Sequence, residues 1–361
     1  MKQHILLSLA ASATLMAAEN IGTVTVEDVT ERLERFGKLK DVIIKTEVIT
    51  AKAIEKKQAT NLSEAVDNEP GIQSATGCSM CGMKRVRING MKGEHTTVLI
   101  DDVPMHSTVS SYYGLDALTT AGISSIEVAR GAGASLIAPG AIGGVINVKS
   151  KKATENSLFV DINGGNKDYR NLSLVGTAVS EDRKTRATVS AQYSNQGQWD
   201  ADKNGVNESP ELENRSASVR LSHDFSNKDN IDLRYTTQKS EVFGGPVTDN
   251  HYEAIMDGTG DNPSFVDGDV RNQYNGDLLA TLEAITTERE EMIARWTHEI
   301  DEDSNFVLTG SVANQIQDSI YEGGTYYGED DSKYADFRYN TFIGEDHFLT
   351  AGLDTKMEDM D

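Results

Sequence analysis

Sulfur and imidazole side chains gather in one short part of this 361-residue sequence. Both of its cysteines, Cys78 and Cys81, lie three residues apart, methionines alternate with them at Met80 and Met83, and His106 follows. Thiolate, thioether and imidazole groups are soft or borderline donors that favour Cu(I). Residue type and spacing therefore make these five side chains a candidate soft-metal site.

Two other interpretations of the cysteine pair stay open. In an oxidising compartment the thiols can form a disulfide, which would stiffen a loop and add little more because the closed ring is small. A redox role is the third interpretation. A zinc site is less favoured, since no second pair of ligands at the usual spacing accompanies the first.

The N-terminus indicates the compartment. Lys2, an apolar run over residues 5–16 and the small residues Ala17 and Ala18 form the pattern of a secretory signal peptide, which we place at residues 1–18. About 12 apolar residues are too few to span a bilayer, which disfavours a membrane anchor. A secreted chain can still cross a membrane as a β-barrel, because closing the sheet satisfies every backbone group.

Charge is unevenly distributed along the chain, whose formal net charge is −23. Residues 1–154 carry 17 Lys and Arg against 16 Asp and Glu, whereas residues 155–361 carry 17 against 41. Such asymmetry indicates two units of different character. It also argues against a nucleic-acid partner, since phosphate binding needs a basic footprint.

The elements that must position the candidate site begin with two helices, predicted at residues 53–57 and 61–66, and two strands at 84–89 and 96–101. A glycine-rich segment, residues 124–150, follows and contains two more short alternating strands. Its Gly131-x-Gly133-x-x-Leu136 lacks the third glycine of the dinucleotide fingerprint. With no phosphate loop and no nucleophile–base set, the sequence does not indicate an enzyme and implies no cofactor.

From about Leu158 onward, apolar residues alternate with polar ones at period two. Short polar turns, at 181–183, 226–229 and 302–304, interrupt the alternation, and longer polar stretches occur at 197–213 and 244–271. Short turns at one end and long loops at the other are typical of an antiparallel transmembrane β-barrel, for which we count about ten strands here.

The glycine-rich segment resembles the end of the plug domain of TonB-dependent outer-membrane receptors, whose pattern is roughly IEV-x-RG-x-x-SALYG-x-GAIGGVIN. The matching positions are Glu127, Arg130, Gly131, Gly140, Ala141, Ile142, Gly143, Gly144, Val145, Ile146 and Asn147. An earlier family pattern, R-x-R/NG…V-x-LIDG-x-P, is matched by Arg85, Arg87, Asn89, Gly90, Leu99, Ile100, Asp101 and Pro104, while Asp102 replaces the usual glycine.

This resemblance implies an α+β plug domain followed by an antiparallel transmembrane β-barrel. The corresponding boundaries are residues 19–38 for a linker with a TonB box, 39–150 for the plug and 155–361 for the N-terminal portion of the barrel. Plugged transporter barrels have about 22 strands. We therefore expect a truncated chain that covers less than half of the barrel.

The resemblance also implies function and partners. We expect an outer-membrane receptor of a Gram-negative bacterium, surrounded by lipid, that takes up a metal chelate such as a ferric siderophore with energy from a periplasmic TonB-type protein. That protein would add an exposed segment of the receptor as a strand. The candidate TonB box, which an ordinary linker would also explain, comprises Ile21, Gly22, Thr23, Val24, Thr25 and Val26.

For an aromatic, anionic chelate the candidate contacts are Arg85, Arg87, Tyr112 and Tyr113. The alternative is a copper-acquiring receptor, because the donor types of the Cys/Met cluster resemble those of such receptors, although its spacing differs. Two further classes are disfavoured. A signalling receptor would carry an extra folded domain before the plug, and a secreted adhesin would not explain the plug pattern.

Overall fold

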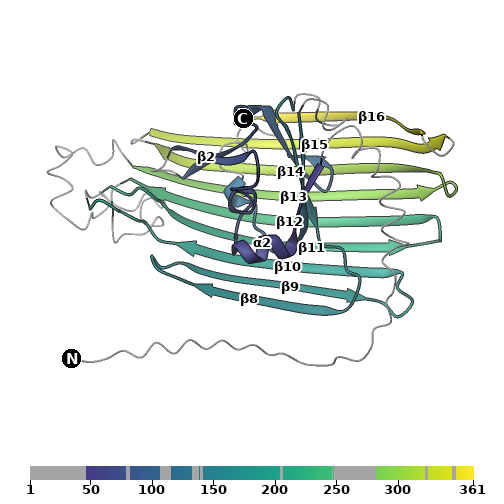
Figure 1. Ribbon diagram of the computed structural model, residues 1–361, viewed down its shortest axis with the longest axis horizontal. Helices are drawn as coiled ribbons and strands as arrows, with labels where there is room; N and C mark the ends of the chain where they lie inside the picture. Colours follow the sequence, from purple (N-terminus) through teal and green to yellow (C-terminus); the bar gives the residue numbers. More distant parts are fainter. Residues whose placement is uncertain are drawn as a thin grey trace.

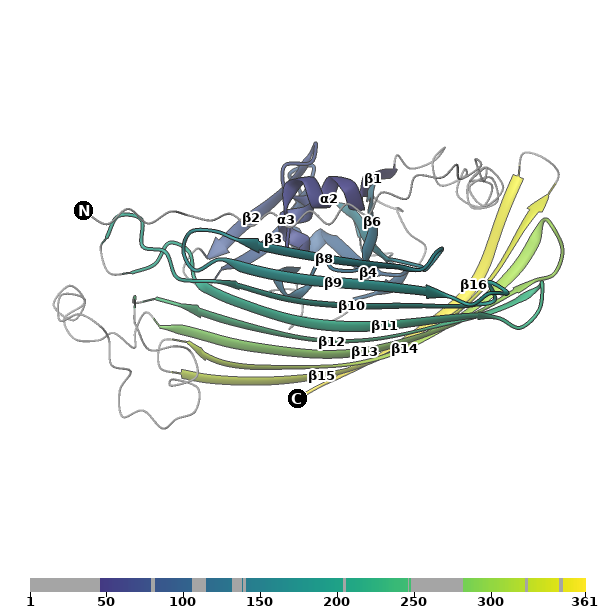
Figure 2. The same ribbon diagram turned by 90° about the horizontal axis from the view of Figure 1, so that it is seen from below.

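A small α/β unit sits in the concave face of a large curved β-sheet, as the two perpendicular views show (Figure 1, Figure 2). None of the helices in the described part of the chain is long and apolar enough to cross a membrane. The computed structural model describes residues 46–78, 82–105, 115–131, 138, 141–203, 206–245, 247, 282–321, 324–343 and 347–361.

The small unit, which we name the plug, contains a five-stranded sheet in the order β1-β6-β7-β4-β5 and a separate hairpin of β2 and β3. In the five-stranded sheet β4 and β7 run parallel and the other pairs are antiparallel. The elements are β1 (Thr46–Thr50), α2 (Ala51–Lys57), α3 (Leu62–Val66), β2 (Ile72–Cys78), β3 (Met83–Ile88), a 3-10 turn (Gly93–His95), β4 (Thr96–Ile100), β5 (Val103–Pro104), β6 (Ile123–Arg130) and β7 (Gly144–Ser150).

Local sequence explains both helices. The Thr50 side chain accepts a hydrogen bond from Ala53 N at the start of α2, and Asn61 accepts one from Glu64 N at the start of α3. Such caps satisfy backbone donors that have no partner inside the helix. Apolar residues of both helices pack with the strands in one core that includes Ile54, Leu62, Val66, Ile88, Ile126 and Ile146. The two predicted helices and four predicted strands are therefore present.

Packing explains the second glycine of the GGVIN motif, Gly144. Gly144 has φ +143°, and a Cβ there would lie 2.4 Å from the carbonyl oxygen of Ala129 on β6. Only glycine allows the two backbones to approach this closely. The glycines thus close a strand pair rather than cradle a phosphate.

The large sheet, which we name the wall, is an antiparallel meander in which each strand pairs with the next. Nine strands lie in the described residues, against the ten or so expected. They are β8 (Ser157–Gly164), β9 (Arg170–Val179), β10 (Thr185–Gln196), β11 (Glu211–Asp224), β12 (Asp229–Gly244), β13 (Glu283–Glu299), β14 (Ser304–Tyr321), β15 (Gly324–Ile343) and β16 (His347–Met360).

Side chains of the wall alternate between its two faces, as the period-two pattern predicted. On β11, Val219 and Leu221 are 41% and 48% exposed on the outer face, whereas Arg220 between them is 4% exposed and faces the plug. At this part of the wall the convex face is thus apolar and exposed, and the concave face is polar and covered by the plug.

The two ends of the wall differ in the length of their connections. The links after β9, β11 and β13 are short turns, whereas those after β10 and β12 span 197–210 and 245–282. Most of the second stretch lies outside the described residues. We refer to these ends as the short-turn end and the long-loop end.

Candidate functional site

The β2–β3 hairpin of the plug reaches the long-loop end of the wall. Cys78 and Met83 face each other across the hairpin and, together with Leu212 of β11, pack on Val242 of β12 and Ile285 of β13. The Cys78 Sγ lies 3.8 Å from Glu283 Oε2. These two members of the candidate metal set therefore hold the hairpin against the wall.

A glycine allows this approach. Gly82, at the tip of the hairpin, has φ +68°, and a Cβ there would lie 2.8 Å from Pro210 Cγ at the start of the wall strand β11. The left-handed backbone and the close wall contact both favour glycine.

The other proposed binding residues are only partly placed. Arg85 is half-buried and Arg87 exposed on β3, opposite Ala75 and Gln73 of β2. The remaining candidates lie outside the described residues: Met80, Cys81, His106, Tyr112, Tyr113 and the TonB box at residues 21–26. Within the described residues, carboxylate oxygens of Asp200, Asp202 and Glu208 lie within 4.8 Å of one another, and none of these three residues was predicted as a ligand.

A buried ion cluster joins plug and wall nearer the short-turn end. Asp101, at the turn between β4 and β5, places Oδ2 2.7 Å from Arg234 Nη1 and Oδ1 3.4 Å from Arg220 Nη1. Ser150 of the plug donates to the same carboxylate from its backbone nitrogen, at 3.0 Å, and from its hydroxyl, at 2.5 Å. The carboxylate and both guanidinium groups are each no more than 7% exposed, so little water screens them.

Wall carboxylates extend this cluster on both sides. Arg220 Nε lies 3.0 Å from Asp232, and Arg234 Nη2 lies 3.2 Å from Glu291, which also binds Arg289 at 2.8 Å. Charges thus alternate across β11, β12 and β13, with the plug carboxylate in the middle of the row.

Asp102 forms the second half of the turn. Its carboxylate lies 2.6 Å from Lys149 Nζ, 2.8 Å from Asn147 Nδ2 and 3.5 Å from the wall residue Arg295. Asp101 and Asp102 have φ of +49° and +66°. This left-handed conformation explains why the family has glycine at the second position, and aspartate is among the side chains that tolerate it.

The cluster controls the ionisation of Asp101. Burial alone would raise the pKa of this carboxyl, but Arg234, Arg220 and the hydrogen bonds from Ser150 together hold the pKa well below its usual range. Asp101 is therefore an anion at any physiological pH.

A second buried carboxyl lies inside the plug and has the opposite character. Asp116 accepts a hydrogen bond from Ser63 and lies 3.6 Å from Lys84 Nζ. Burial raises the pKa of Asp116 despite the opposing influence of Lys84 and Ser63. This group links α3 to β3 rather than the plug to the wall.

Polar wall side chains also bind the plug backbone. Gln192 of β10 donates to Thr60 O and accepts from Ala121 N, both at 2.8 Å, and Asn214 of β11 donates to Asp116 O at 2.8 Å. Inward-facing amides of the wall thus replace water on backbone groups of the plug.

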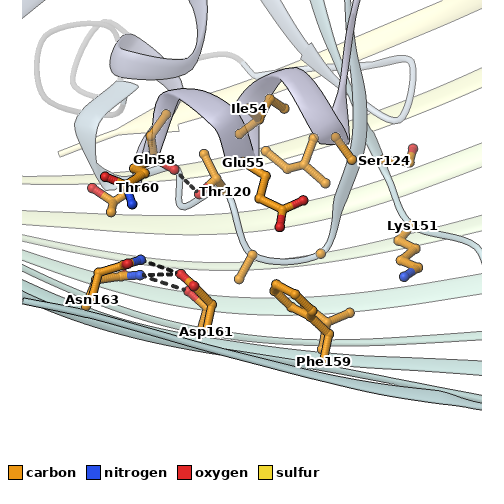
Figure 3. Close-up of a pocket in the computed structure, with 18 residues that line it drawn as sticks. Ile54, Glu55, Gln58, Thr60, Thr120, Ser124, Lys151, Phe159, Asp161 and Asn163 are labelled. Atoms are coloured by element: carbon orange, nitrogen blue, oxygen red, sulfur yellow. Dashed lines mark hydrogen bonds between the residues drawn. The ribbon is translucent and has the colours of Figure 1, made fainter. Parts of the chain in front are cut away.

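A cavity of about 500 Å³ separates α2 from β8 and β9 (Figure 3). Figure 3 shows Glu55 of α2 directed toward Phe159 and Asp161 of β8. Asp161 accepts hydrogen bonds from Asn163 at 2.5 Å and Asn171 at 3.4 Å. The plug is therefore less tightly packed on this part of the wall than at the ion cluster.

Sequence reasoning missed the ion cluster. The available signal was an arginine between apolar neighbours in a strand, as at Arg220 and at Arg234 between Leu233 and Tyr235. Where the outer face is apolar, such a residue points inward and needs a buried partner. The partner, Asp101, is 119 residues away from Arg220 along the chain.

Comparison with known proteins identifies the plug. Residues 38–145 match the family described as the TonB-dependent Receptor Plug Domain. This part of the chain is a plug domain of the TonB-dependent receptors. The plug within a strongly curved antiparallel sheet is the arrangement of plug and barrel strands found in receptors of this family.

Curated relatives and solved structures agree. The chain is 27% identical over 311 residues to the ferric enterobactin receptor PirA of Pseudomonas aeruginosa, covering 74% of this chain and 42% of that protein. It is 28% identical over 146 residues to the vitamin B12 transporter BtuB of Vibrio cholerae, covering 40% of this chain and 24% of that protein. A crystal structure of a mutant of the ferric enterobactin receptor PfeA from Pseudomonas aeruginosa matches with a TM-score of 0.68 at 18% identity, covering 90% of this chain and 50% of that one.

The matches cover only part of each relative. The chain spans half or less of the length of these relatives. The structural matches are below 25% identity and show the fold alone, and the relatives support no copper-acquiring receptor.

Proposed function

We propose that this protein is an outer-membrane receptor for energy-coupled uptake of a metal chelate such as a ferric siderophore. The observation that carries the proposal is a family plug seated by buried ion pairs inside a curved sheet whose inner face is polar. A plug held in this way closes a passage and has to move for cargo to pass. The names of the relatives, which include ferric enterobactin receptors, support a ferric chelate as cargo.

The outer face of the wall supports a lipid environment. Many large apolar side chains are exposed on it, whereas soluble proteins rarely expose so extensive an apolar area. Aromatic rings gather toward the short-turn end, where the Trp296 and Phe306 ring centroids are 5.0 Å apart, as in the aromatic girdles of outer-membrane barrels. The exposed residues include Leu158, Ile162, Leu172, Val189, Val219, Leu221, Leu233, Leu308, Val312 and Leu353.

The proposed organisation follows from that role. Residues 1–18 act as the signal peptide, 19–38 carry the TonB box, 39–150 form the plug and 155–361 contribute barrel strands. A TonB-type periplasmic protein would bind residues 21–26 by strand addition and pull on β1, which follows them along the chain. Transport of this kind makes and breaks no bond in the cargo, so no enzymatic step is part of the proposal.

The proposed cargo contacts are Arg85, Arg87, Tyr112 and Tyr113, whose cationic and aromatic side chains suit an anionic, aromatic chelate. The packing of Cys78 and Met83 on the wall favours a structural role for the hairpin tip, near the long-loop end where cargo would enter.

The test is uptake in a TonB-competent Gram-negative host that lacks its own catecholate receptors. Cells producing the full-length receptor that contains this chain receive radioactive iron as ferric enterobactin, ferric citrate or ferric chloride, and parallel cultures receive labelled cyanocobalamin or copper. We expect uptake of a ferric chelate above the empty-vector level, abolished by deletion of residues 21–26. Uptake of cyanocobalamin or copper alone would overturn the siderophore assignment, and uptake that survives the deletion would overturn the position of the TonB box.

A further inference from the structure

The wall carries an excess of positive charge where the plug turn meets it. On β11, β12 and β13 four arginines, Arg220, Arg234, Arg289 and Arg295, accompany two carboxylates, Asp232 and Glu291. The turn of Asp101 and Asp102 supplies the two negative charges that balance this region. Without the turn, the wall would face the lumen with uncompensated guanidinium groups.

Arg220, Arg234 and Arg295 are each held by wall residues as well as by the plug. Arg220 is held by Asp232, Arg234 by Glu291 and by Thr236, whose hydroxyl accepts from Nε at 3.0 Å, and Arg295 by Thr309 at 3.3 Å. Arg220 also donates to the Ser150 hydroxyl and carbonyl of the plug, at 2.6 and 3.2 Å, and Arg295 donates to the Asp101 carbonyl. Because the wall partners remain when the plug turn leaves, each arginine keeps a support within the wall. They form a preorganised set of donors.

The side chains of the turn bind these arginines as the carboxylates of a ligand would. Arg234 and Arg220 approach the two oxygens of Asp101 separately, at 2.7 and 3.4 Å, and Arg295 approaches Asp102 at 3.5 Å. Burial lowers the pKa of the nearby Lys152, Arg220 and Arg295 lower it further, and Asp232 and Asp101 raise it, so charges of both signs surround the turn.

A buried guanidinium that loses its counterion is costly, so withdrawal of the turn favours any anion that can replace it. We propose that Arg220, Arg234 and Arg295 form an anion-binding strip, which the plug fills with Asp101 and Asp102 and which binds the anionic oxygens of the passing chelate once the turn withdraws. The identity of this anion rests on the proposed function, whereas the strip itself does not.

The strip lies away from the cargo entrance. Arg220, Arg234 and Arg295 are all in the short-turn halves of their strands, and the β2–β3 hairpin contacts the long-loop end. The strip would therefore act after initial capture, during passage along the wall.

Chemical rescue tests the strip without transport. Asp101→Ala removes the internal carboxylate and leaves space for a small one. The purified receptor in detergent is melted in sodium formate or acetate and in sodium chloride at equal ionic strength. We expect Asp101→Ala to melt several degrees below the wild type and to regain at least about 2 °C, saturably, with formate or acetate but not with chloride.

Two controls define the result. Asp101→Ala/Arg234→Gln should show no such gain, because the donor is lost, and Asp116→Ala should show none, because its carboxyl faces Lys84 instead of the strip. An equal gain in chloride, in either control or in the wild type would overturn the proposal. No gain in a folded Asp101→Ala protein would do the same.

Uptake provides the second measurement if Asp101→Ala does not fold. Arg234→Gln should lower uptake of an anionic ferric chelate at least fivefold while surface affinity changes less than twofold, and Arg234→Lys should restore part of the rate because it restores the charge. Equal uptake by wild type and Arg234→Gln would overturn the strip. A wild type that takes up no chelate would instead overturn the proposed function, and the rescue result would still judge the strip.

Discussion

Asp102 holds a backbone conformation that most side chains avoid, and it gains ion pairs by doing so. Asp102→Gly removes the ion pairs but also the strain, whereas Asp102→Ala removes the ion pairs and keeps the strain. We expect the free energy of unfolding of Asp102→Gly to exceed that of Asp102→Ala by about 1 kcal/mol. Urea denaturation of the two variants in detergent measures the difference, and equal stabilities would show that the turn is unstrained.

The same turn shows what single residues reveal before a structure is known. Asp101 was recognised as part of the family pattern, but nothing near it in the sequence indicates a buried ion pair. Its partners lie on three different strands, and which strand faces which part of the plug depends on the complete fold. The left-handed conformation of Asp102 could have been predicted, because this aspartate replaces a family glycine.

At the scale of elements, the β2–β3 hairpin depends on Gly82 for its position against the wall. Gly82→Ala should detach the tip, because both the φ of +68° and the 2.8 Å approach to Pro210 oppose a Cβ. Gly90→Ala is a matched control, since Gly90 has φ +75° but no atom within 4 Å of the added Cβ. We expect faster amide hydrogen exchange over β2 and β3 in Gly82→Ala than in Gly90→Ala. Similar exchange in both would assign the effect to backbone strain alone.

The β2–β3 hairpin also shows which kind of element local sequence patterns fail to predict. The helices and the wall strands follow from caps and from period-two alternation, which are local signals. No strand was predicted over β2, because Ile72–Cys78 contains a single large aliphatic residue and no alternation. It is a strand because β3 and the wall lie beside it, which no local window contains.

For the whole molecule, stability should depend on pH through Asp101. A carboxyl whose pKa is lowered by folding stabilises the folded state above its ordinary pKa of 3.8, and this stabilisation is lost only as pH falls through the lowered value. Asp101→Asn should therefore cost about 3–5 kcal/mol near pH 7, with the difference from wild type shrinking only in strong acid. Unfolding at a series of pH values measures this, and a difference that vanishes by pH 5 would contradict it.

For Asp116 we expect stability to change with pH in the opposite direction. Its pKa is raised by folding, so its favourable contribution is present below pH 3.8 and is lost as pH rises through the raised value. Relative to the wild type, Asp116→Asn should gain stability as pH increases, because the amide keeps the shape without a buried charge. A pH-independent difference between the two proteins would show that folding leaves the pKa of Asp116 unchanged.

Besides the ion pairs, the wall holds the plug by its backbone atoms. Gln192 binds Thr60 O and Ala121 N, Asn214 binds Asp116 O, and Arg220 binds Ser150 O at 3.2 Å. Every amino acid offers a backbone carbonyl, and every one except proline an N–H, so most substitutions at these plug positions keep these backbone contacts. Descendants of one ancestral receptor can therefore change the cargo-facing surface of the plug while they inherit the same plug-binding side chains on the wall.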